Sequence, residues 1–213
     1  MTTETGPGRR ERKKRETGEA IARAAAALFA ERGYESVTVL DIAEAADVSE
    51  QTVYNHFPTK EHLVFSRADE FEADLAARIQ ERPAGMSVIG AVRADLLNML
   101  DTLADVPPER LRGGMPWLVA SAPGLRRWQL EMTARHAEAL AALIAQEEDA
   151  IGTDPAARVI AYALLAPYQV LIEELGRRLV EGQSPRQVAR ALRPVIQAAC
   201  DRLGRGLDEH HRP

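Results

Sequence analysis

The sequence predicts an all-α protein with a small N-terminal domain and a larger C-terminal helical domain. Apolar residues recur at helical spacing along most of the chain, and no stretch alternates apolar and polar residues as a half-buried strand does. Polar caps, glycines and prolines divide the chain into segments of helix length. With 213 residues, of which 46% are apolar, the chain can bury one large core or two smaller ones.

The N-terminus is expected to be a flexible basic arm that leads into a helix. Residues 1–8, MTTETGPG, have nothing to bury and are expected to be disordered. We assign residues 1–15 to the arm because Glu11 alone stands among the six basic side chains of residues 9–15, which are Arg9, Arg10, Arg12, Lys13, Lys14 and Arg15. Gly33 ends the helix that follows, and its inward face consists of Ile21, Ala25, Leu28 and Phe29.

Residues 38–60 are expected to form two short helices joined by a tight turn. Thr38 is a good N-cap for the first helix, because its hydroxyl can accept a hydrogen bond from a free first-turn N–H. Ser49 caps the second helix, which has to end near His56 since Pro58 disfavours the helical conformation of the residue before it. Two helices with such a turn form a helix-turn-helix, and the preceding helix completes a three-helix core.

The rest of the chain divides into further helices. Thr59 is expected to cap a long helix that continues to Arg82, where a proline and a glycine break it. Ser87 is the next cap, and both Asp154 and Ser184 stand directly before a proline that suits the first helical position. The expected helices after the first long one cover residues 87–106, 116–121, 125–146, 154–181 and 184–203.

The last two expected helices are candidates for a dimer interface. About three residues connect them, which makes them antiparallel neighbours, and Pro167 and Pro194 are expected to kink them. Both are apolar on several sides, so they need more than one partner. We expect a two-fold symmetric four-helix interface with a second copy of the chain, formed by Leu171, Leu175, Val188, Leu192, Val195, Ile196 and Ala199.

Charge and composition exclude several classes of protein. The formal charge of −5 argues against a protein coated in nucleic acid, although the arm concentrates positive charge locally. Cys200 is the single cysteine, so no internal disulfide is possible, and we expect it to be a core residue. The N-terminus lacks the apolar run of a signal peptide, and the longest uncharged stretch has 14 residues. We therefore expect a cytoplasmic protein without a membrane segment.

The sequence predicts no enzymatic site. Its five histidines form no spaced metal-ligand set with acidic residues. Neither a glycine-rich phosphate loop nor a nucleophile motif is present in the sequence. We therefore expect neither a metal nor a cofactor.

One stretch resembles a known family. GYESVTVLDIAEAADVSEQTVYNHFPTKEHL is similar to the DNA-binding signature of the TetR family of one-component transcriptional regulators. The similarity covers residues 17–65. The residues whose spacing matches the family signature are Gly33-Tyr34, Ile42-Ala43, Val48-Ser49, Tyr54, Phe57 and Lys60. Beyond residue 70 the resemblance implies a shared arrangement of helices and no shared sequence motif. It implies a helix-turn-helix domain over residues 16–65 and a helical ligand-binding and dimerisation domain over residues 66–213.

The second helix of a helix-turn-helix lies in the major groove, where its first residues read base edges. Gln51, Tyr54 and Asn55 are the predicted base-reading residues, because Gln and Asn pair with adenine edges and a Tyr ring can pack on a thymine methyl. Val53 and Phe57 point the other way and are expected in the core. The predicted phosphate contacts are Thr38, Thr52, His56 and Lys60.

Several of these assignments have alternatives. His56 could merely cap the helix, and Lys60 could be a solvated side chain, although the resemblance favours contact with DNA for Lys60. Glu50 and Leu40 depart from the residues that are commoner in the family, and Leu40 weakens any base contact from its own helix. Glu50 either accepts a hydrogen bond from a cytosine amine or only stabilises the helix N-terminus. We expect Glu50 to stabilise the helix N-terminus. The basic arm is expected to follow the DNA backbone or enter the minor groove, with a solubilising tail as the alternative.

The C-terminal part contains most of the bulky, adaptable residues, which suggests an apolar pocket with a few polar groups. An ordinary helical core without a cavity is the alternative. The candidate pocket residues are Asn98, Met99, Met115, Trp117, Trp128, Met132, Arg135, His136, Tyr162, Tyr168 and Gln169.

These features together predict a ligand-responsive transcriptional regulator. Our first choice is a repressor that binds a palindromic double-stranded DNA operator as a homodimer and that a small hydrophobic or aromatic effector releases. Two alternatives stay open at this point. One is an activator on the same fold, and the other is a helical sensor whose helix-turn-helix serves a protein partner instead of DNA.

Overall fold

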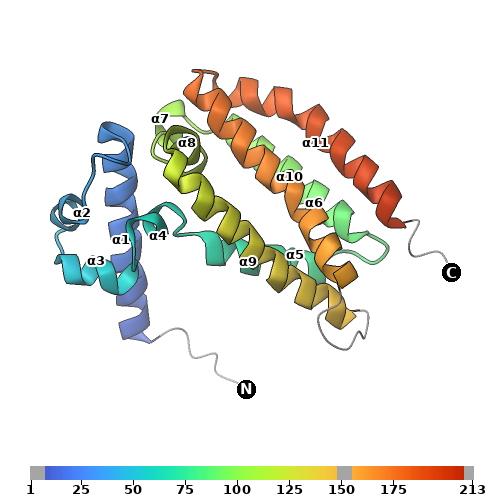
Figure 1. Cartoon of the computed structure of the whole chain (residues 1–213), viewed down its shortest axis with the longest axis horizontal. Coiled ribbons are helices and arrows are strands. Elements are labelled where there is room, and N and C mark those ends of the chain that lie inside the picture. The colour runs from blue at the N-terminus through green and yellow to red at the C-terminus, as the bar shows by residue number, and fades with distance from the viewer. Residues whose placement is uncertain (1–7, 148–154, 209–213) are drawn as a thin grey trace.

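Eleven helices form the described part of the chain (Figure 1). The structure, a computed structural model, describes residues 8–147 and 155–208. These ranges contain no strand, so the predicted all-α class is confirmed. The helices are α1 (Arg9–Arg32), α2 (Val39–Ala45), α3 (Glu50–His56), α4 (Lys60–Val64), α5 (Ala68–Gln80), α6 (Val88–Ala104), α7 (Pro108–Leu111), α8 (Met115–Ser121), α9 (Pro123–Glu147), α10 (Pro155–Val180) and α11 (Pro185–Asp208).

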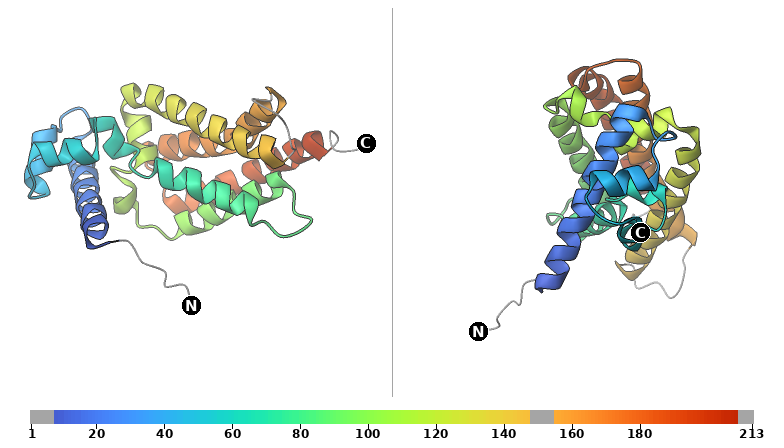
Figure 2. Two further views of the ribbon diagram at one scale, coloured as in Figure 1. Left: turned by 90° about the horizontal axis from the view of Figure 1, so that it is seen from below. Right: turned by 90° about the vertical axis from the view of Figure 1, so that its left-hand side faces the viewer.

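The first three helices pack around one small core at one end of the molecule. Ile21 and Phe29 of α1, Ile42 of α2 and Val53 of α3 are almost completely buried in it. This is the predicted three-helix unit with the predicted inward faces. Figure 2 shows that α1 stands roughly across the end of the longer C-terminal bundle.

Two predicted caps define the helix-turn-helix. Thr38 Oγ1 accepts a hydrogen bond from the Asp41 N–H (3.1 Å), and the Asp41 carboxylate accepts one from the Thr38 N–H (2.7 Å), which makes a reciprocal capping box. Hydrogen bonds from the Thr38 hydroxyl and N–H lower the pKa of Asp41. Ser49 Oγ accepts from the Thr52 N–H (3.1 Å) and begins α3. Both short helices therefore start where the sequence predicts.

The basic arm differs from its prediction. α1 begins at Arg9, so the six basic residues form its first two turns instead of a flexible segment. Spaced acidic side chains explain the helix, because Arg12 lies 3.7 Å from Glu16 and Arg15 lies 3.4 Å from Glu19 at i, i+4 spacing. All six basic side chains stay exposed. Residues 1–7, for which we predict disorder, lie outside the described residues.

The long helix predicted from Thr59 to Arg82 is wrong, because the chain breaks between α4 and α5. Phe65 leaves the helical conformation with φ −99° and ψ 24°. The break lets Phe65 pack on the N-terminal core while Phe71 packs on the C-terminal core. The Thr59 hydroxyl does not cap α4 and instead hydrogen bonds with His62 Nδ1 (3.0 Å).

α6, α9, α10 and α11 form the C-terminal bundle, with α5 against α6 and α9 (Figure 2). Its buried core includes Leu96, Leu164 and Ile196, together with Cys200 as predicted. Ser87 and Ser184 cap α6 and α11 as predicted, whereas the predicted cap Asp154 lies outside the described residues. α9 begins two residues earlier than predicted, α11 continues to Asp208, and α7 is an additional short helix. α10 and α11 run on through Pro167 and Pro194, so their kinks stay predictions.

α10 is long and apolar enough to cross a membrane by length and composition alone. The core helix of a soluble protein passes the same test, so one such helix is weak evidence for a membrane. Leu164, Tyr168 and Leu171 of α10 are buried in the bundle core, and the helix packs against α8, α9 and α11. We therefore describe α10 as a core helix.

α8 connects the two parts of the molecule. Gly113, directly before α8, has φ +73° and lies so close to α1 that a Cβ there would overlap the Ala26 carbonyl oxygen. Gly176 of α10 lies against α8 in the same way, because its Cβ would overlap the Pro116 carbonyl oxygen. Only glycine permits such approaches of one backbone to another. α8 is thus held between α1 and α10.

Candidate nucleic-acid interface and effector site

The outward face of α3 carries three exposed polar or aromatic side chains. Gln51, Tyr54 and Asn55 lie at i, i+3 and i+4, and Tyr54 is 45% exposed despite its size. Gln51 Nε2 donates a hydrogen bond to Asn55 Oδ1 (3.1 Å). Val53 is completely buried on the opposite side, as predicted. The three predicted base-reading residues therefore share one accessible face.

The two departures from the family pattern lie beside this face. Leu40 on α2 is 52% exposed, which is unusual for a leucine next to a polar surface. Glu50 is exposed in the first turn of α3. A carboxylate in that turn stabilises the positive end of the helix dipole, which agrees with the role expected for Glu50.

Two of the predicted phosphate contacts already take part in caps. The Thr38 hydroxyl both accepts from the Asp41 N–H and donates to the Asp41 carboxylate. The Thr52 hydroxyl lies 2.9 Å from Ser49 Oγ. Their contact with phosphate stays a prediction. A Thr38 hydroxyl that donates to a phosphate would have to share its hydrogen with the Asp41 carboxylate, and a Thr52 hydroxyl that donates to Ser49 would have to share its hydrogen with Ser49 Oγ.

His56 packs against α1 at the end of α3. Its ring is half-buried, and a Cβ added to Gly18 would lie 3.2 Å from His56 Nδ1. Burial lowers the pKa of His56, and the positive charge of Lys14 lowers it further. The neutral ring is therefore favoured in the unbound protein. The approach of Gly18 to the His56 ring places the first half of α1 beside the end of α3.

Lys60 has a structural role that the sequence does not reveal. Its Nζ donates hydrogen bonds to the backbone carbonyls of Tyr34 (2.8 Å) and Val37 (3.1 Å), and it lies 4.1 Å from the centroid of the Tyr34 ring. The Tyr34 hydroxyl donates to Glu61 Oε1 (3.0 Å), and burial followed by this carboxylate raises the pKa of Tyr34. Lys60 thus fixes the α1–α2 connection to α4. One of its three N–H bonds stays available for a phosphate.

The predicted pocket residues do not form one site. Four of them are exposed, namely Asn98, Met99, Arg135 and Tyr162. Met115 and Trp117 pack against the N-terminal core. Trp128 meets the edge of the His62 ring with centroids 5.0 Å apart, and it lines a cleft of about 520 Å³ with Tyr34, Glu35, Glu61, Gly124, Arg127 and Glu131. The four exposed residues therefore lie on the protein surface. Met115, Trp117 and Trp128 lie where the C-terminal domain meets the DNA-binding part.

Two of the predicted pocket residues meet in the interior beside residues that sequence reasoning missed. The Phe71 ring contacts both His136 (centroids 5.4 Å apart) and Tyr168 (5.2 Å). The Tyr168 hydroxyl donates to the buried carboxylate of Asp95 (2.7 Å), which also pairs with Arg78 Nε (3.2 Å). Burial, followed by the charge of Asp95, raises the pKa of Tyr168. An aspartate on the apolar face of α6 is the sequence signal that could have revealed this network.

A second cleft lies between α5 and α9. Its volume is about 280 Å³, and it is lined by Glu72, Ala73, Leu75, Ala76, His136, Ala139, Leu140 and Leu143. His136 Nε2 lies 3.9 Å from the Glu72 carboxylate at this cleft. Met132 and Gln169 are half-buried nearby on α9 and α10, and Gln169 Nε2 donates to Glu173 (3.2 Å). The cleft is therefore mainly apolar with one polar pair.

Most of the predicted dimer residues are unavailable to a partner chain. Leu171, Val188, Leu192 and Ile196 are buried within the core of their own chain, and Leu175 packs against that core. The prediction was wrong for these residues because α11 turns this face toward α6 and α10 packs against α8 and α9. Ala199 is half-buried, whereas Val195 is exposed. The large apolar side chains that α10 and α11 do expose, within the described residues, are Val159, Tyr162, Val170, Val180 and Val195.

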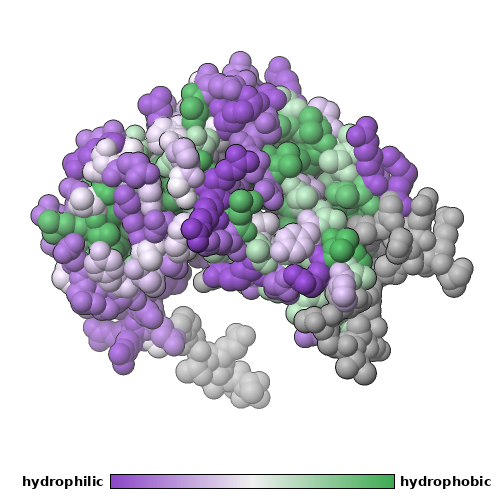
Figure 3. Space-filling model, in the orientation of Figure 1, coloured by the Kyte–Doolittle hydropathy of each residue, from purple (hydrophilic) through white to green (hydrophobic). Residues whose placement is uncertain are grey.

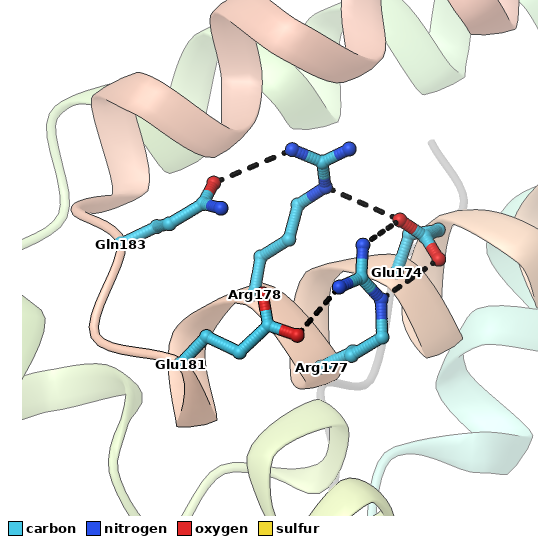
Figure 4. Close-up of polar contacts among 5 residues, drawn as sticks. All are labelled: Glu174, Arg177, Arg178, Glu181 and Gln183. Atoms are coloured by element: carbon cyan, nitrogen blue, oxygen red, sulfur yellow. Dashed lines mark hydrogen bonds and ion pairs between the residues drawn. The ribbon is translucent and has the colours of Figure 1, made fainter.

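A group of charged residues stabilises the end of α10 (Figure 4). Arg177 pairs with Glu174 (2.7 Å) and with Glu181 (2.6 Å). Arg178 donates to Glu174 (3.2 Å) and to Gln183 Oε1 (3.3 Å) in the turn that leads to α11. Hydrogen bonds from Arg177, against a smaller opposing effect of burial, lower the pKa of Glu174. The group thereby fixes the connection between α10 and α11.

Comparisons with known proteins agree with this arrangement. The sequence profile of bacterial regulatory proteins of the tetR family matches residues 21–66, which contain the second half of α1 and all of α2, α3 and α4. The HTH-type transcriptional regulator TcmR of Streptomyces glaucescens is 34% identical over 151 residues, or 69% of this chain and 67% of TcmR. The HTH-type transcriptional repressor KstR2 of Rhodococcus jostii is 44% identical over 57 residues, which are 27% of this chain and 28% of KstR2.

The fold also matches solved structures along most of the chain. NalD, the secondary repressor of the MexAB-OprM multidrug efflux pump in Pseudomonas aeruginosa, superposes with a TM-score of 0.56 over 87% of this chain and 97% of that chain. The two sequences are 20% identical, so this likeness shows the fold alone. The sequence match to TcmR extends well past the helix-turn-helix into the C-terminal domain. The chain therefore belongs to the TetR family, and it is a transcriptional regulator and not an enzyme.

Proposed function

We propose that the protein is a cytoplasmic repressor that binds a palindromic operator as a homodimer and releases it when a small apolar or aromatic molecule binds. The outward face of α3 is the observation that carries the proposal. Gln51, Tyr54 and Asn55 stand exposed there, on a helix whose opposite face is fixed in the core by Val53. KstR2 is named as a repressor, which supports repression over activation.

In the complex, α3 lies in the major groove with its exposed face toward the bases. Gln51 and Asn55 exchange their mutual hydrogen bond for adenine edges, each of which offers one donor and one acceptor. Tyr54 packs on a thymine methyl or donates to a phosphate. The exposed basic side chains of the first turns of α1 follow the DNA backbone beside the end of α3.

The homodimer uses the outer surface of α10 and α11. Val159 is 69% exposed, and Tyr162, Val170 and Val195 add further exposed apolar area. Figure 3 shows apolar side chains gathered over these two helices on one face of the molecule. An exposed apolar patch of this kind is typical of an interaction site. A two-fold axis through it would present the two α3 helices to the halves of a palindrome.

The effector enters the cleft between α5 and α9. Its apolar lining and its volume of about 280 Å³ suit a small molecule, and His136 with Glu72 supplies the polar groups. α5 follows α4 after a short break, and Lys60 of α4 holds the α1–α2 connection. An occupant that favours a different spacing of α5 and α9 therefore shifts α4 and α3 as well.

Selection of bound sequences from a random DNA pool tests the proposal. We expect a palindrome with two half-sites about one helical turn or a small multiple of it apart. A gel shift at two salt concentrations should then show weaker binding at the higher one, because basic side chains of α1 contact phosphates. Failure to enrich any sequence would favour the alternative of a protein partner, and activation of a reporter gene by the operator-bound protein would favour an activator.

A further inference from the structure

α9 contains a buried carboxamide that the folded chain does not use. Gln129 is 4% exposed, and within residues 8–147 and 155–208 neither its Nε2 nor its Oε1 has a hydrogen-bond partner. A buried amide without partners destabilises a protein, and leucine would fill a similar volume without that penalty. The presence of a glutamine at this position therefore suggests a partner from outside the chain.

Gln129 lies between the two hydrophobic cores. Leu125, one turn earlier on α9, belongs to the N-terminal core, and Ala137, two turns later, belongs to the C-terminal core. No residue of α9 between these two belongs to either core, although this part of α9 is described completely. The same face of the helix continues from Gln129 to Met132 and His136, at i+3 and i+7. The segment is thus an interruption in the packing with polar and adaptable side chains.

The neighbouring helices define what faces this segment. Two ion pairs fix the antiparallel register of α9 against α10, namely Arg126 with Glu173 (4.0 Å) and Glu138 with Arg158 (2.9 Å). This register places Gln129 opposite the turn of α10 that holds Tyr168 and Gln169. Phe71 of α5 contacts both Tyr168 and His136. Aromatic and polar groups from three helices therefore surround the stretch of α9 from Gln129 to His136.

The α5–α9 cleft ends at His136, which is also the last residue of this stretch. His136 lines the cleft and lies seven residues after Gln129 on the same face of α9. Seven residues of helix correspond to about 10 Å along its axis. A flat bicyclic molecule that lay along α9 between His136 and Gln129 would therefore span this distance together with a substituent at its edge.

We propose that Gln129 is the hydrogen-bonding anchor of the effector, and that the effector is an uncharged, largely aromatic molecule with a donor and an acceptor side by side at one edge. Carboxamides, lactams and hydroxy-ketones have this arrangement, which matches the Nε2 donor and the Oε1 acceptor of a glutamine. An uncharged effector fits because Asp95, the buried carboxylate of this core, is already paired with Arg78 and Tyr168. The inference rests on the proposed function, whose effector class it narrows.

Titration calorimetry on the full-length protein tests the anchor with three probes of one shape. These are 2-naphthamide, 2-methylnaphthalene and 2-naphthoate. We expect the amide to bind at least about tenfold more tightly than the methyl compound, because it adds two hydrogen bonds in a dry site. The naphthoate should bind more weakly than the amide, because its charge finds no partner. Gln129→Leu should remove the preference for the amide, whereas Gln146→Leu, at an exposed position of the same helix, should keep it.

The unliganded proteins provide an independent readout. Gln129→Leu should raise the melting temperature by about 2 to 4 °C, because it removes a buried amide without partners. Gln146→Leu should leave the melting temperature nearly unchanged. A lower melting temperature for Gln129→Leu would mean that the amide stabilises the fold, and this would overturn the proposal. Equal binding of the amide and the methyl compound, or no binding of the amide, would overturn it too.

Operator binding distinguishes a failure of this inference from a failure of the proposed function. Gln129→Leu should bind the operator as tightly as the unaltered protein when no probe is present. An unaltered protein that selects an operator but shows no preference for 2-naphthamide contradicts only the anchor. An unaltered protein that selects no operator contradicts the proposed function, whatever the probes do.

Discussion

The DNA-binding part and the C-terminal domain use their polar groups in different ways. In the first, short-range hydrogen bonds close the helix ends, as Thr38 and Ser49 do for α2 and α3. In the second, the buried polar contacts join distant segments, because Asp95 of α6 binds Tyr168 of α10 and Arg78 of α5. The local pattern leaves the outward face of α3 free for a partner. The long-range pattern links three helices, so that a displacement of one of them also displaces the others.

This difference in polar contacts indicates which side chains are available for binding in each part. In the DNA-binding part, the side chains without structural duties are exposed on α3 and can be exchanged without unfolding the protein. In the described part of the C-terminal domain, the buried side chain of Gln129 has no hydrogen-bond partner, so that a ligand has to enter the fold to reach it. Variants at the junction of the two parts give the largest expected effects.

Gly113→Ala is expected to destabilise the protein by roughly 3 to 5 kcal/mol. The residue has φ +73°, and the new Cβ would overlap the backbone of α1 at Ala26, which cannot move without disturbing the N-terminal core. Urea unfolding of the purified variant measures the loss. Operator binding should fall with it, because α8 would no longer fit between α1 and α10.

Gly182→Ala is the matched control for the junction. Gly182 has φ +84°, yet a Cβ there would meet open space. Its substitution should cost only about 1 to 2 kcal/mol from the backbone conformation. Equal losses at both positions would show that strain in φ, and not the contact with α1, explains the effect of Gly113→Ala.

Lys60→Met is expected to reduce stability by about 3 kcal/mol. It removes two hydrogen bonds from a charged donor and leaves the buried carbonyls of Tyr34 and Val37 without it. Lys13→Met, at an exposed position of α1, should have almost no effect on stability. Urea unfolding compares the two variants. If Lys60→Met kept full stability and lost only operator affinity, Lys60 would be a phosphate contact in the first place.

The DNA-binding part could be predicted from the sequence nearly in full, because its signals are local. Caps at Thr38 and Ser49 and the position of Val53 lie within a few residues of the structure that they determine. The exceptions are the helical start of α1 at Arg9, the end of α4 at Val64 and the role of Lys60. The last of these shows the reason most clearly. The partners of Lys60 precede it by 26 and 23 residues, and no spacing pattern predicts which carbonyls a lysine will reach.

In the C-terminal domain, the sequence predicted the helices better than the groups that they bring together. Tyr162 and Tyr168 belong to the same helix, yet the first is exposed and the second is buried. α10 is apolar on several sides, so periodicity alone could not decide which face meets the bundle. Trp128 turns toward His62 in the DNA-binding part, and that contact depends on how the two parts pack.

Asn55→Ala is expected to relax operator specificity at one base pair by about 1 to 3 kcal/mol. The side chain is exposed and hydrogen bonds with the exposed Gln51, so the free energy of unfolding should change by less than about 0.5 kcal/mol. Competition gel shifts with operators altered at single positions measure the specificity. A uniform loss for all operators would assign Asn55 to the backbone, and a large loss of stability would contradict the separation of structural and exposed side chains on α3.

The protonation of His56 is expected to have the smallest effect on stability. Its pH dependence tests whether the ring has a structural role or a role in DNA binding. Burial and Lys14 lower the pKa of His56 below its ordinary value of 6.5. Between the lowered value and about 6.5 the unfolded chain therefore binds more protons, so stability should fall as the pH drops through this window and stay unaffected above it. Urea unfolding at several pH values measures this slope, which His56→Gln should remove.

Operator binding should respond to pH in the opposite direction if His56 meets a phosphate. A phosphate favours the protonated ring, so the complex would bind more protons than the free protein and affinity would rise on acidification below pH 6.5. One proton limits the change to about tenfold per pH unit. Gel shifts across this range, with His56→Gln as the control, decide between the two roles of the ring. A pH-dependent stability with a pH-independent affinity would make His56 part of the α1–α3 packing, and only opposite slopes would make it part of the DNA interface.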